Sequence, residues 1–211
     1  MTKSIAKQVF RLLDADPYIK QSLKLGVANY SAIAKKLRKE HLPKASLEAV
    51  KAAVRRYSIE EESFDYIKDL GEVLRGTRTV LKSDVCVLLL FPDTHLDLEK
   101  ITQKIGNDFS IVRSSNAITM ITGQEHSEQL LKLVGKQNMI KFLKNHYLLT
   151  LQSPEGIETA PGFVAFFSEI LARNGINIRE YYSCYTDTVF VLAKKDALKA
   201  YSLFDRVLGQ H

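Results

Sequence analysis

Cysteine is scarce in this sequence, and the two that occur stand far apart. Cys86 and Cys184 each lie in an apolar run typical of a β-strand, and no paired-cysteine spacing suited to a metal or redox centre is present. We therefore expect two buried free thiols in a reducing compartment, which favours a cytoplasmic location. We expect no cofactor and no metal.

Long hydrophobic runs are also missing. No uninterrupted apolar stretch reaches the length of about eighteen residues that a membrane-spanning helix needs. The opening MTKSIAKQVFRLLDADPYIK lacks the apolar stretch of a signal peptide. These absences predict a soluble chain that does not enter a membrane.

Signatures of common catalytic sites are absent as well. The sequence contains no Walker-type phosphate loop and no G-x-S-x-G, H-E-x-x-H or G-x-G-x-x-G pattern. The five histidines show no ligand spacing; they are His41, His95, His126, His146 and His211. We therefore expect that the protein is not an enzyme.

Positive charge is concentrated in the first quarter of the chain. Residues 1–57 hold thirteen Lys and Arg against four Asp and Glu, whereas residues 58–211 hold seventeen against twenty. The two segments therefore have net charges of +9 and −3. A basic head favours an anionic partner, most commonly nucleic acid; the alternative is a basic surface that contacts only solvent.

Residues 1–58 are predicted to form a helical domain. Apolar residues recur there at helical spacing, and the predicted cap residues are Asp16, followed by Pro17, then Asn29 and Ser46. The last helix would have an inner stripe of Leu47, Val50, Val54 and Tyr57. Residues 59–76 are predicted to be a linker, most of it one amphipathic helix that could pair with its copy in a dimer.

After residue 77 the sequence becomes rich in β-branched and apolar residues, and two units follow with the same order of elements. The order is strand, helix, strand, strand, helix. The first unit covers residues 85–91, 96–106, 110–115, 117–122 and 125–133, and the second covers 147–152, 163–174, 177–184, 188–193 and 196–208. This order predicts a ferredoxin-like, mainly antiparallel sheet with helices on one face. Residues 139–144 could close the first unit, and residues 77–82 could supply an edge strand to either.

The second unit contains the most specific pattern. Pro161-Gly162 directly precedes its first helix, and Gly175-Ile176-Asn177-Ile178 directly follows that helix and opens a strand. This resembles the ACT family, and the trailing TDTVFVLAKKDALKAYSLF resembles the third strand and second helix of ACT modules in the regulatory portions of aspartate kinases. The first unit departs from the pattern, because its loop PDTHLD lacks Pro-Gly and its second strand opens NDFSIV.

The ACT resemblance implies a site for an amino acid or similar metabolite at a seam between paired modules. A glycine at the turn lets the backbone approach a ligand, and the helix N-terminus after it presents free N–H groups to a carboxylate. Asn177 and the main chain near Ile176 would bind the ammonium group or fix the loop. The predicted site residues are Thr159, Ala160, Pro161, Gly162, Phe163, Val164, Gly175, Ile176, Asn177 and Ile178. The alternative is that Pro161-Gly162 is only a turn and Gly175 only a helix cap.

The head resembles helix-turn-helix and winged-helix DNA-binding regions, in NYSAIAKKL followed by LEAVKAAVRRY. Basic residues of these helices would contact base edges or phosphates. The predicted DNA-binding residues are Lys35, Lys36, Arg38, Lys39, Lys51, Arg55 and Arg56. The alternative is a basic bundle that docks on an acidic protein.

The sequence thus predicts an α+β protein with an N-terminal helical, helix-turn-helix-like bundle followed by two ferredoxin-like ACT modules. The predicted boundaries are a head at 1–58, a linker at 59–76, a degenerate module at 77–144 and a second module at 145–211. We expect a homodimer or larger even assembly that senses a metabolite and regulates transcription by binding duplex DNA. The alternatives are a regulatory subunit docking on a metabolic enzyme, or a stand-alone amino-acid-binding protein.

Overall fold

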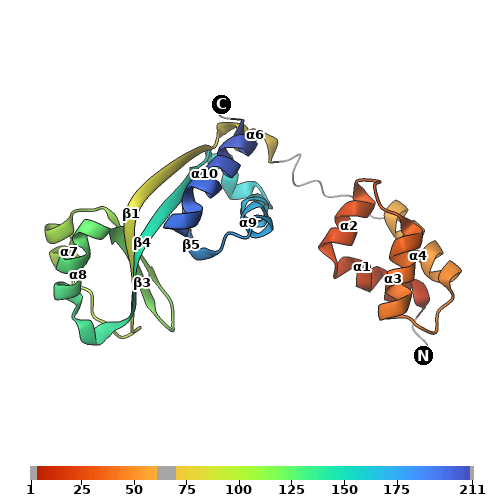
Figure 1. The fold of residues 1–211 in the computed structure, drawn as a ribbon, viewed down its shortest axis with the longest axis horizontal. Coiled ribbons are helices and arrows are strands. Elements are labelled where there is room, and N and C mark those ends of the chain that lie inside the picture. Colours follow the sequence, from red (N-terminus) through yellow and green to blue (C-terminus); the bar gives the residue numbers. More distant parts are fainter. Residues whose placement is uncertain (1–3, 61–69, 210–211) are drawn as a thin grey trace. The chain divides into compact units, whose positions relative to one another are not determined.

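The chain divides into two compact units, residues 1–65 and residues 66–211, which are described separately. The structure is a computed structural model that describes residues 4–60 and 70–209 (Figure 1). Within these residues, no helix is long and apolar enough to cross a membrane.

The first unit is a bundle of helices around its own apolar core. Its helices are α1 (Ile5–Asp14), α2 (Pro17–Lys24), α3 (Tyr30–Glu40) and α4 (Leu47–Glu60). Val9 and Leu13 of α1 and Leu37 of α3 are buried against Val50 and Val54 of α4. The predicted inner stripe of α4 is therefore confirmed, except that Leu47 is only partly buried.

Side-chain caps fix where these helices begin. The Asp16 carboxylate accepts hydrogen bonds from the N–H groups of Tyr18 and Ile19 at 3.1 and 3.0 Å, and Pro17 is the first helical residue of α2. Asn29 caps α3 and Ser46 caps α4 in the same way. The predicted caps are confirmed, because each depends only on a short polar side chain beside the first turn of its helix.

The predicted linker helix is described only at its two ends. Residues 59 and 60 continue α4, and a short helix, α6 (Gly71–Gly76), follows later. Leu70 and Val73 are buried in the core of the second unit. The rest of the predicted linker helix, residues 61–69, lies outside the described residues.

The second unit is a single six-stranded antiparallel sheet in the order β2-β3-β1-β4-β6-β5. The strands are β1 (Arg78–Leu90), β2 (Phe109–Arg113), β3 (Ile118–Gly123), β4 (Met139–Gln152), β5 (Ile178–Cys184) and β6 (Asp187–Ala193). The α-helices are α7 (Leu98–Ile105), α8 (Ser127–Val134), α9 (Phe163–Arg173) and α10 (Lys194–Leu208), and the 3-10 turns are η1 (Gln124–His126), η2 (Lys136–Asn138) and η3 (Glu155–Thr159). The sequence placed the six described strands and the helices α7 to α10 to within about three residues, apart from the continuity of β1 and β4.

The long strands β1 and β4 are shared by the two halves of the sheet. Residues 85–90 of β1 pair with β3, and residues 87–90 pair with residues 139–143 of β4, which makes the first half-sheet with β2. Residues 78–82 pair with residues 148–152, which makes the second half-sheet with β6 and β5. The predicted closing strand and edge strand therefore exist, but each is continuous with the strand that follows it in the sequence.

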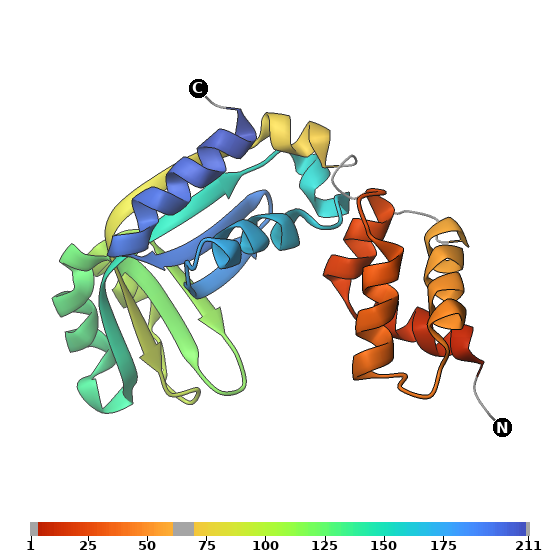
Figure 2. The same ribbon diagram turned by 45° about the vertical axis from the view of Figure 1, so that its right-hand side comes forward.

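Both long strands are irregular at the same level of the sheet. The register of their pairing shifts between Lys82 and Val85, and Asp84 and Asn145 have φ angles of 52° and 58°. Irregularities of this kind bend strands and increase their twist. Helices α7 and α8 cover one face of the first half-sheet, and α9 and α10 cover one face of the second (Figure 2).

The faces without helices also share a small core. Val87 and Ile121 of the first half-sheet cluster with Val191 of the second, and Leu148 and Tyr182 pack around them. The bend therefore turns the two bare faces toward one another.

The two cysteines differ in environment. Cys86 is fully buried under α7 and α8, as predicted. Cys184 is exposed, so the prediction of a second buried thiol is wrong. Cys184 is the last residue of β5, a strand at the edge of the sheet, where fewer neighbours cover the side chain.

Candidate functional site

The turn before α9 has the backbone that the predicted ligand loop requires. Gly162 has a φ of 89°, in the left-handed region, where a residue with a Cβ costs about 1–2 kcal/mol. Ile157 and Ala160 pack against the core, which holds the loop in place. Pro161 is exposed and Phe163 is buried, so the backbone of the turn lies between solvent and core.

The N-terminus of α9 has no side-chain cap. The N–H groups of Phe163, Val164 and Ala165 precede the first hydrogen bond of the helix, from Phe166 N–H to Gly162 O at 2.8 Å. Such N–H groups, together with the helix dipole, favour a bound carboxylate or phosphate.

The equivalent helix of the first half-sheet is already capped. Asp97 accepts a hydrogen bond from the Lys100 N–H at 3.1 Å and pairs with the Lys100 ammonium at 2.8 Å. The hydrogen bond from the Lys100 side chain is the main reason that the pKa of Asp97 lies below its ordinary value. The chain's own carboxylate thus caps the N-terminus of α7, whereas no side-chain hydrogen bond caps that of α9.

The other predicted ligand residues lie at the far end of α9. Gly175 has a φ of 70°, and the Ile176 N–H donates to Leu171 O at 3.0 Å, which is a helix C-cap arrangement. Ile176 is buried, and Asn177 is exposed at the start of β5. Since α9 has eleven residues, about 16 Å separates this group from the loop at Gly162. One copy of the chain therefore does not bring the two halves of the predicted site together.

A half-open cavity that the sequence did not predict lies on the bare side of the sheet. It measures about 230 Å³ and is lined by Lys82, Asp108, Ser110, Ile121 and Leu148 among others. These residues come from β1, β2, β3, β4 and the turn before β2. No sequence pattern marks them, because only the bend of the sheet assembles them.

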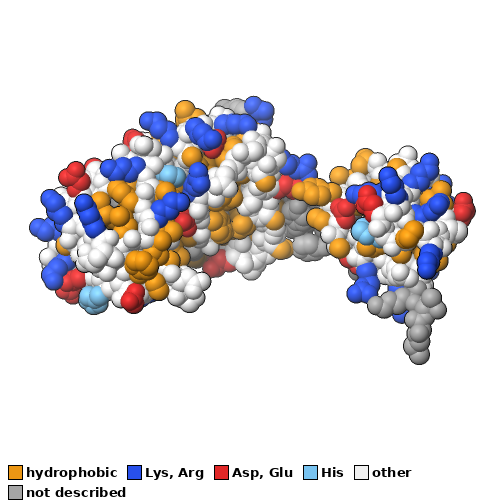
Figure 3. Space-filling view, turned by 60° about the horizontal axis from the view of Figure 1, so that its bottom comes forward, with side chains coloured by type: hydrophobic (Ala, Val, Ile, Leu, Met, Phe, Trp, Pro, Cys, Tyr) orange, Lys and Arg blue, Asp and Glu red, His pale blue; other side chains and the backbone are white. Residues whose placement is uncertain are grey.

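On the helical unit, all seven predicted DNA-binding residues are exposed. Figure 3 shows Lys and Arg side chains on the visible face of this unit, together with exposed hydrophobic side chains. Lys35, Arg38 and Lys39 surround a shallow cavity of about 220 Å³ beside Pro43. Lys36 instead lies 3.9 Å from the Asp16 carboxylate, and the Arg56 guanidinium lies 5.2 Å from the centre of the Phe10 ring.

The helix-turn-helix resemblance stays a prediction. Helices α3 and α4 pack against one another, but residues 41–46 connect them. This connection is longer than the turn of about three or four residues in helix-turn-helix motifs.

Comparisons with known proteins identify the fold of the sheet unit. No protein-family model matches the chain, and no curated protein matches it. Among solved structures, Escherichia coli aspartokinase III in complex with aspartate and ADP is similar over 62% of this chain, with a TM-score of 0.51 and 15% identity. A structure of aspartokinase α and β subunits is similar over 62% of this chain and 97% of its own, with a TM-score of 0.50 and 12% identity.

A third structure, Clostridium acetobutylicum aspartate kinase, has a TM-score of 0.50 and 13% identity over 62% of this chain. The present chain spans only about a third of that enzyme and of the Escherichia coli enzyme. The fold is therefore α+β, with a helical region followed by a six-stranded antiparallel sheet that is similar to part of these aspartokinase structures.

Proposed function

We propose that the chain is a non-catalytic regulatory protein whose sheet unit binds a small amino acid or a similar metabolite. The observation that carries this proposal is the left-handed Gly162 at a helix N-terminus that no side chain caps. The ligand carboxylate would accept hydrogen bonds from the N–H groups of Phe163, Val164 and Ala165. The likeness of the fold to aspartokinase III, which was solved with bound aspartate, supports the same ligand class.

A second copy of the chain completes this site in our proposal. Residues 159–164 and 175–178 lie at opposite ends of α9, so they act on one ligand only if two copies lie side by side in opposite directions. The loop of one copy would then hold the carboxylate, and Asn177 of the other would contact the ammonium group. Ligand binding would favour one dimer geometry, because the ligand would bind that geometry more tightly than any other. Regulation requires this difference in affinity.

A thermal-shift screen against the twenty amino acids tests the proposal, because a ligand of the folded state raises the melting temperature. Gly162→Val should abolish the shift caused by any amino acid that binds at this loop, while the protein stays folded. Gly106→Val is the matched control, since Gly106 also has a positive φ, of 71°, and follows α7 instead. An unchanged ligand response in folded Gly162→Val would exclude the α9 loop as the site.

The helical unit would transmit the response by docking on an acidic surface of a metabolic enzyme. Its excess of basic residues supports an anionic partner, and the fold likeness of the sheet unit to parts of aspartate kinases favours an enzyme. Co-purification of the full chain from a cell extract at low and high salt, with and without the identified amino acid, tests this docking. A partner that elutes with salt and responds to the amino acid supports it, and recovery of nucleic acid alone contradicts it.

Duplex DNA is the second candidate partner. The observation that favours it is the shallow cavity on the helical unit, which is lined by Lys35, Arg38 and Lys39 and by no carboxylate. Phosphate contacts make the logarithm of affinity fall steeply with the logarithm of salt concentration. Replacing Lys51 and Arg55 by Ala should reduce that slope by about one unit for each phosphate that the variant no longer binds. Lys100→Ala, on the other unit, is the control. Equal binding by all variants, or no binding at low salt, would exclude DNA recognition by these helices.

A further inference from the structure

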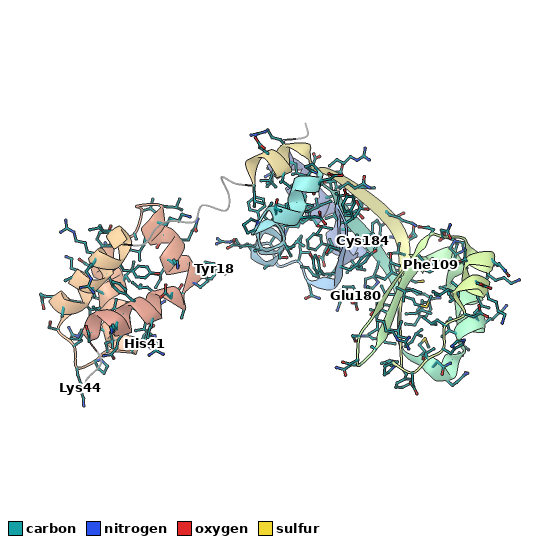
Figure 4. The ribbon with its side chains drawn as sticks, turned by 180° about the vertical axis from the view of Figure 1, so that it is seen from behind. Tyr18, His41, Lys44, Phe109, Glu180 and Cys184 are labelled. Atoms are coloured by element: carbon teal, nitrogen blue, oxygen red, sulfur yellow. The ribbon has the colours of Figure 1, made fainter. Side chains whose placement is uncertain are left out.

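The two edge strands of the sheet meet across its bare faces. Ser110 Oγ of β2 and Tyr182 Oη of β5 lie 2.9 Å apart, although these strands stand at opposite ends of the strand order. Figure 4 shows Phe109 at the start of β2 near the part of the sheet unit that holds Glu180 and Cys184 of β5. This contact joins the two half-sheets beside the cavity, which Ser110 lines.

Two opposite charges line this space. The Lys82 ammonium on β1 pairs with the Asp108 carboxylate just before β2. Thr122 Oγ1 donates a hydrogen bond to the backbone oxygen of Asp108 at 2.8 Å, which holds the backbone of Asp108 in place. Both charged side chains remain partly exposed, so the pair by itself contributes little to stability.

The rest of the lining suits a short aliphatic group. Ile121 and Leu148 form the apolar wall, beside the cluster that joins the two bare faces. A volume of about 230 Å³ corresponds to roughly seven or eight water molecules at about 30 Å³ each. That is the size of a small amino acid and below the volumes of about 300–1,000 Å³ that are usual for larger ligands.

We propose that this cavity binds a small aliphatic α-amino acid in its zwitterionic form. The ligand carboxylate lies beside the Lys82 ammonium, the ligand ammonium lies beside the Asp108 carboxylate, and the aliphatic side chain contacts Ile121 and Leu148. Each charge then has an opposite charge as neighbour, in charge-assisted hydrogen bonds that are stronger than neutral ones. This site is separate from the loop before α9 and does not depend on it.

Binding here would link the two half-sheets. Lys82 lies at the bend of β1, and Asp108 lies at the edge strand of the first half-sheet. A molecule that contacts both stabilises the bent form of the sheet relative to more open forms.

The experiment is calorimetry and thermal shift on the full chain with L-alanine, L-valine and L-leucine as probes. At least one should bind and raise the melting temperature. The single-charge analogues isobutylamine and isovalerate should bind at least tenfold more weakly, because each satisfies only one of the two charges. Equal binding of a single-charge analogue, or binding of none of the three amino acids, overturns the proposal without any substitution.

Variants then locate the site. Lys82→Gln and Asp108→Asn should each weaken probe binding at least tenfold, whereas Lys100→Gln, which removes the cation of the exposed pair on α7, should not. Gly162→Val should leave binding at this cavity unchanged. Binding that is lost in Gly162→Val and retained in Lys82→Gln and Asp108→Asn would refute the cavity site and support the α9 loop.

Discussion

At the scale of the residue, Asp84 and Asn145 mark the bend of the sheet. Both have positive φ angles, and Asp and Asn tolerate this region better than other residues with a Cβ. The Asn145 N–H donates a hydrogen bond to Gln124 Oε1 at 2.9 Å, which holds the bend on one side. Both residues thus lie where the register of β1 and β4 shifts, between the two half-sheets.

Glu180 provides a pH prediction at the same scale. It pairs with Val191 on the bare face of the sheet, where burial raises the pKa of its carboxyl above the ordinary value of 4.5. Its contribution to stability is therefore fully present below pH 4.5 and is lost as pH rises through the pKa of the folded state. Glu180→Gln should raise the melting temperature at pH 7, because the amide carries no charge to bury.

Thermal melts between pH 3.5 and pH 8 check this prediction. The parent and the variant should converge at the acidic end, where both side chains are neutral. A melting temperature at pH 7 that is equal or lower in the variant would show that burial of the Glu180 charge does not limit stability.

At the scale of the element, α9 and α10 attach to the second half-sheet through aromatic rings in tilted and edge-to-face contacts. The centre of the Phe167 ring on α9 lies 4.9 Å from that of Phe163 and 4.6 Å from that of Phe204 on α10. The centre of the Phe204 ring in turn lies 5.7 Å from that of Phe190 on β6. The position of the candidate ligand loop therefore depends on a buried aromatic cluster, since α9 begins at Phe163.

Phe167→Ala should be strongly destabilising. Phe167 is fully buried, and truncating such a side chain typically costs about 3–5 kcal/mol. Urea unfolding followed by circular dichroism measures the change. Val164→Ala is the control on the same helix, since Val164 is 39% exposed and should cost about 0.5 kcal/mol or less. Similar costs for both substitutions would contradict the packing described for α9.

At the scale of the whole molecule, each unit has its own core. The helical unit buries residues such as Val9, Leu13 and Val54, while the core of the second half-sheet includes Leu70 and Val73, which precede its first strand. The Thr77 hydroxyl lies 2.7 Å from Val73 O and 2.9 Å from Ser153 Oγ, and so ties this segment to the end of β4. The segment before β1 therefore belongs to the sheet unit.

A pair of fragments tests this division. Residues 66–211 should fold alone with a cooperative melt, whereas residues 78–211 should lose several kcal/mol because Leu70 and Val73 leave the core. Thermal and urea unfolding of both fragments give the comparison. Equal stability of the two fragments would show that the segment is dispensable.

The two outer strands of the sheet predict that copies of the chain associate. β2 and β5 are the outer strands, so among the described residues each has one backbone edge without a partner strand. Open edges favour pairing with another chain. Light scattering should therefore give about twice the 23.9 kDa mass of the chain at micromolar concentration. A mass of 23.9 kDa across the concentration range would contradict both the dimer and the shared ligand site.

The sequence by itself determined the local features of this protein. Caps at Asp16, Asn29 and Ser46, and the turns at Gly162 and Gly175, follow from short-range chemistry that each segment carries with it. Strand and helix positions followed from apolar periodicity, which depends only on which face of an element is buried. The α+β class was therefore predictable.

Only the tertiary structure decided how these segments combine. The sequence did not show that β1 and β4 each serve both half-sheets, because strand pairing depends on residues far apart in the chain. It did place the two groups of predicted ligand residues at opposite ends of one helix, and the structure confirms that helix as α9. It also missed the Lys82–Asp108 cavity and the exposure of Cys184. Both depend on the bend of the sheet and on which strands form its edges, and these are properties of the assembled sheet that no single segment contains.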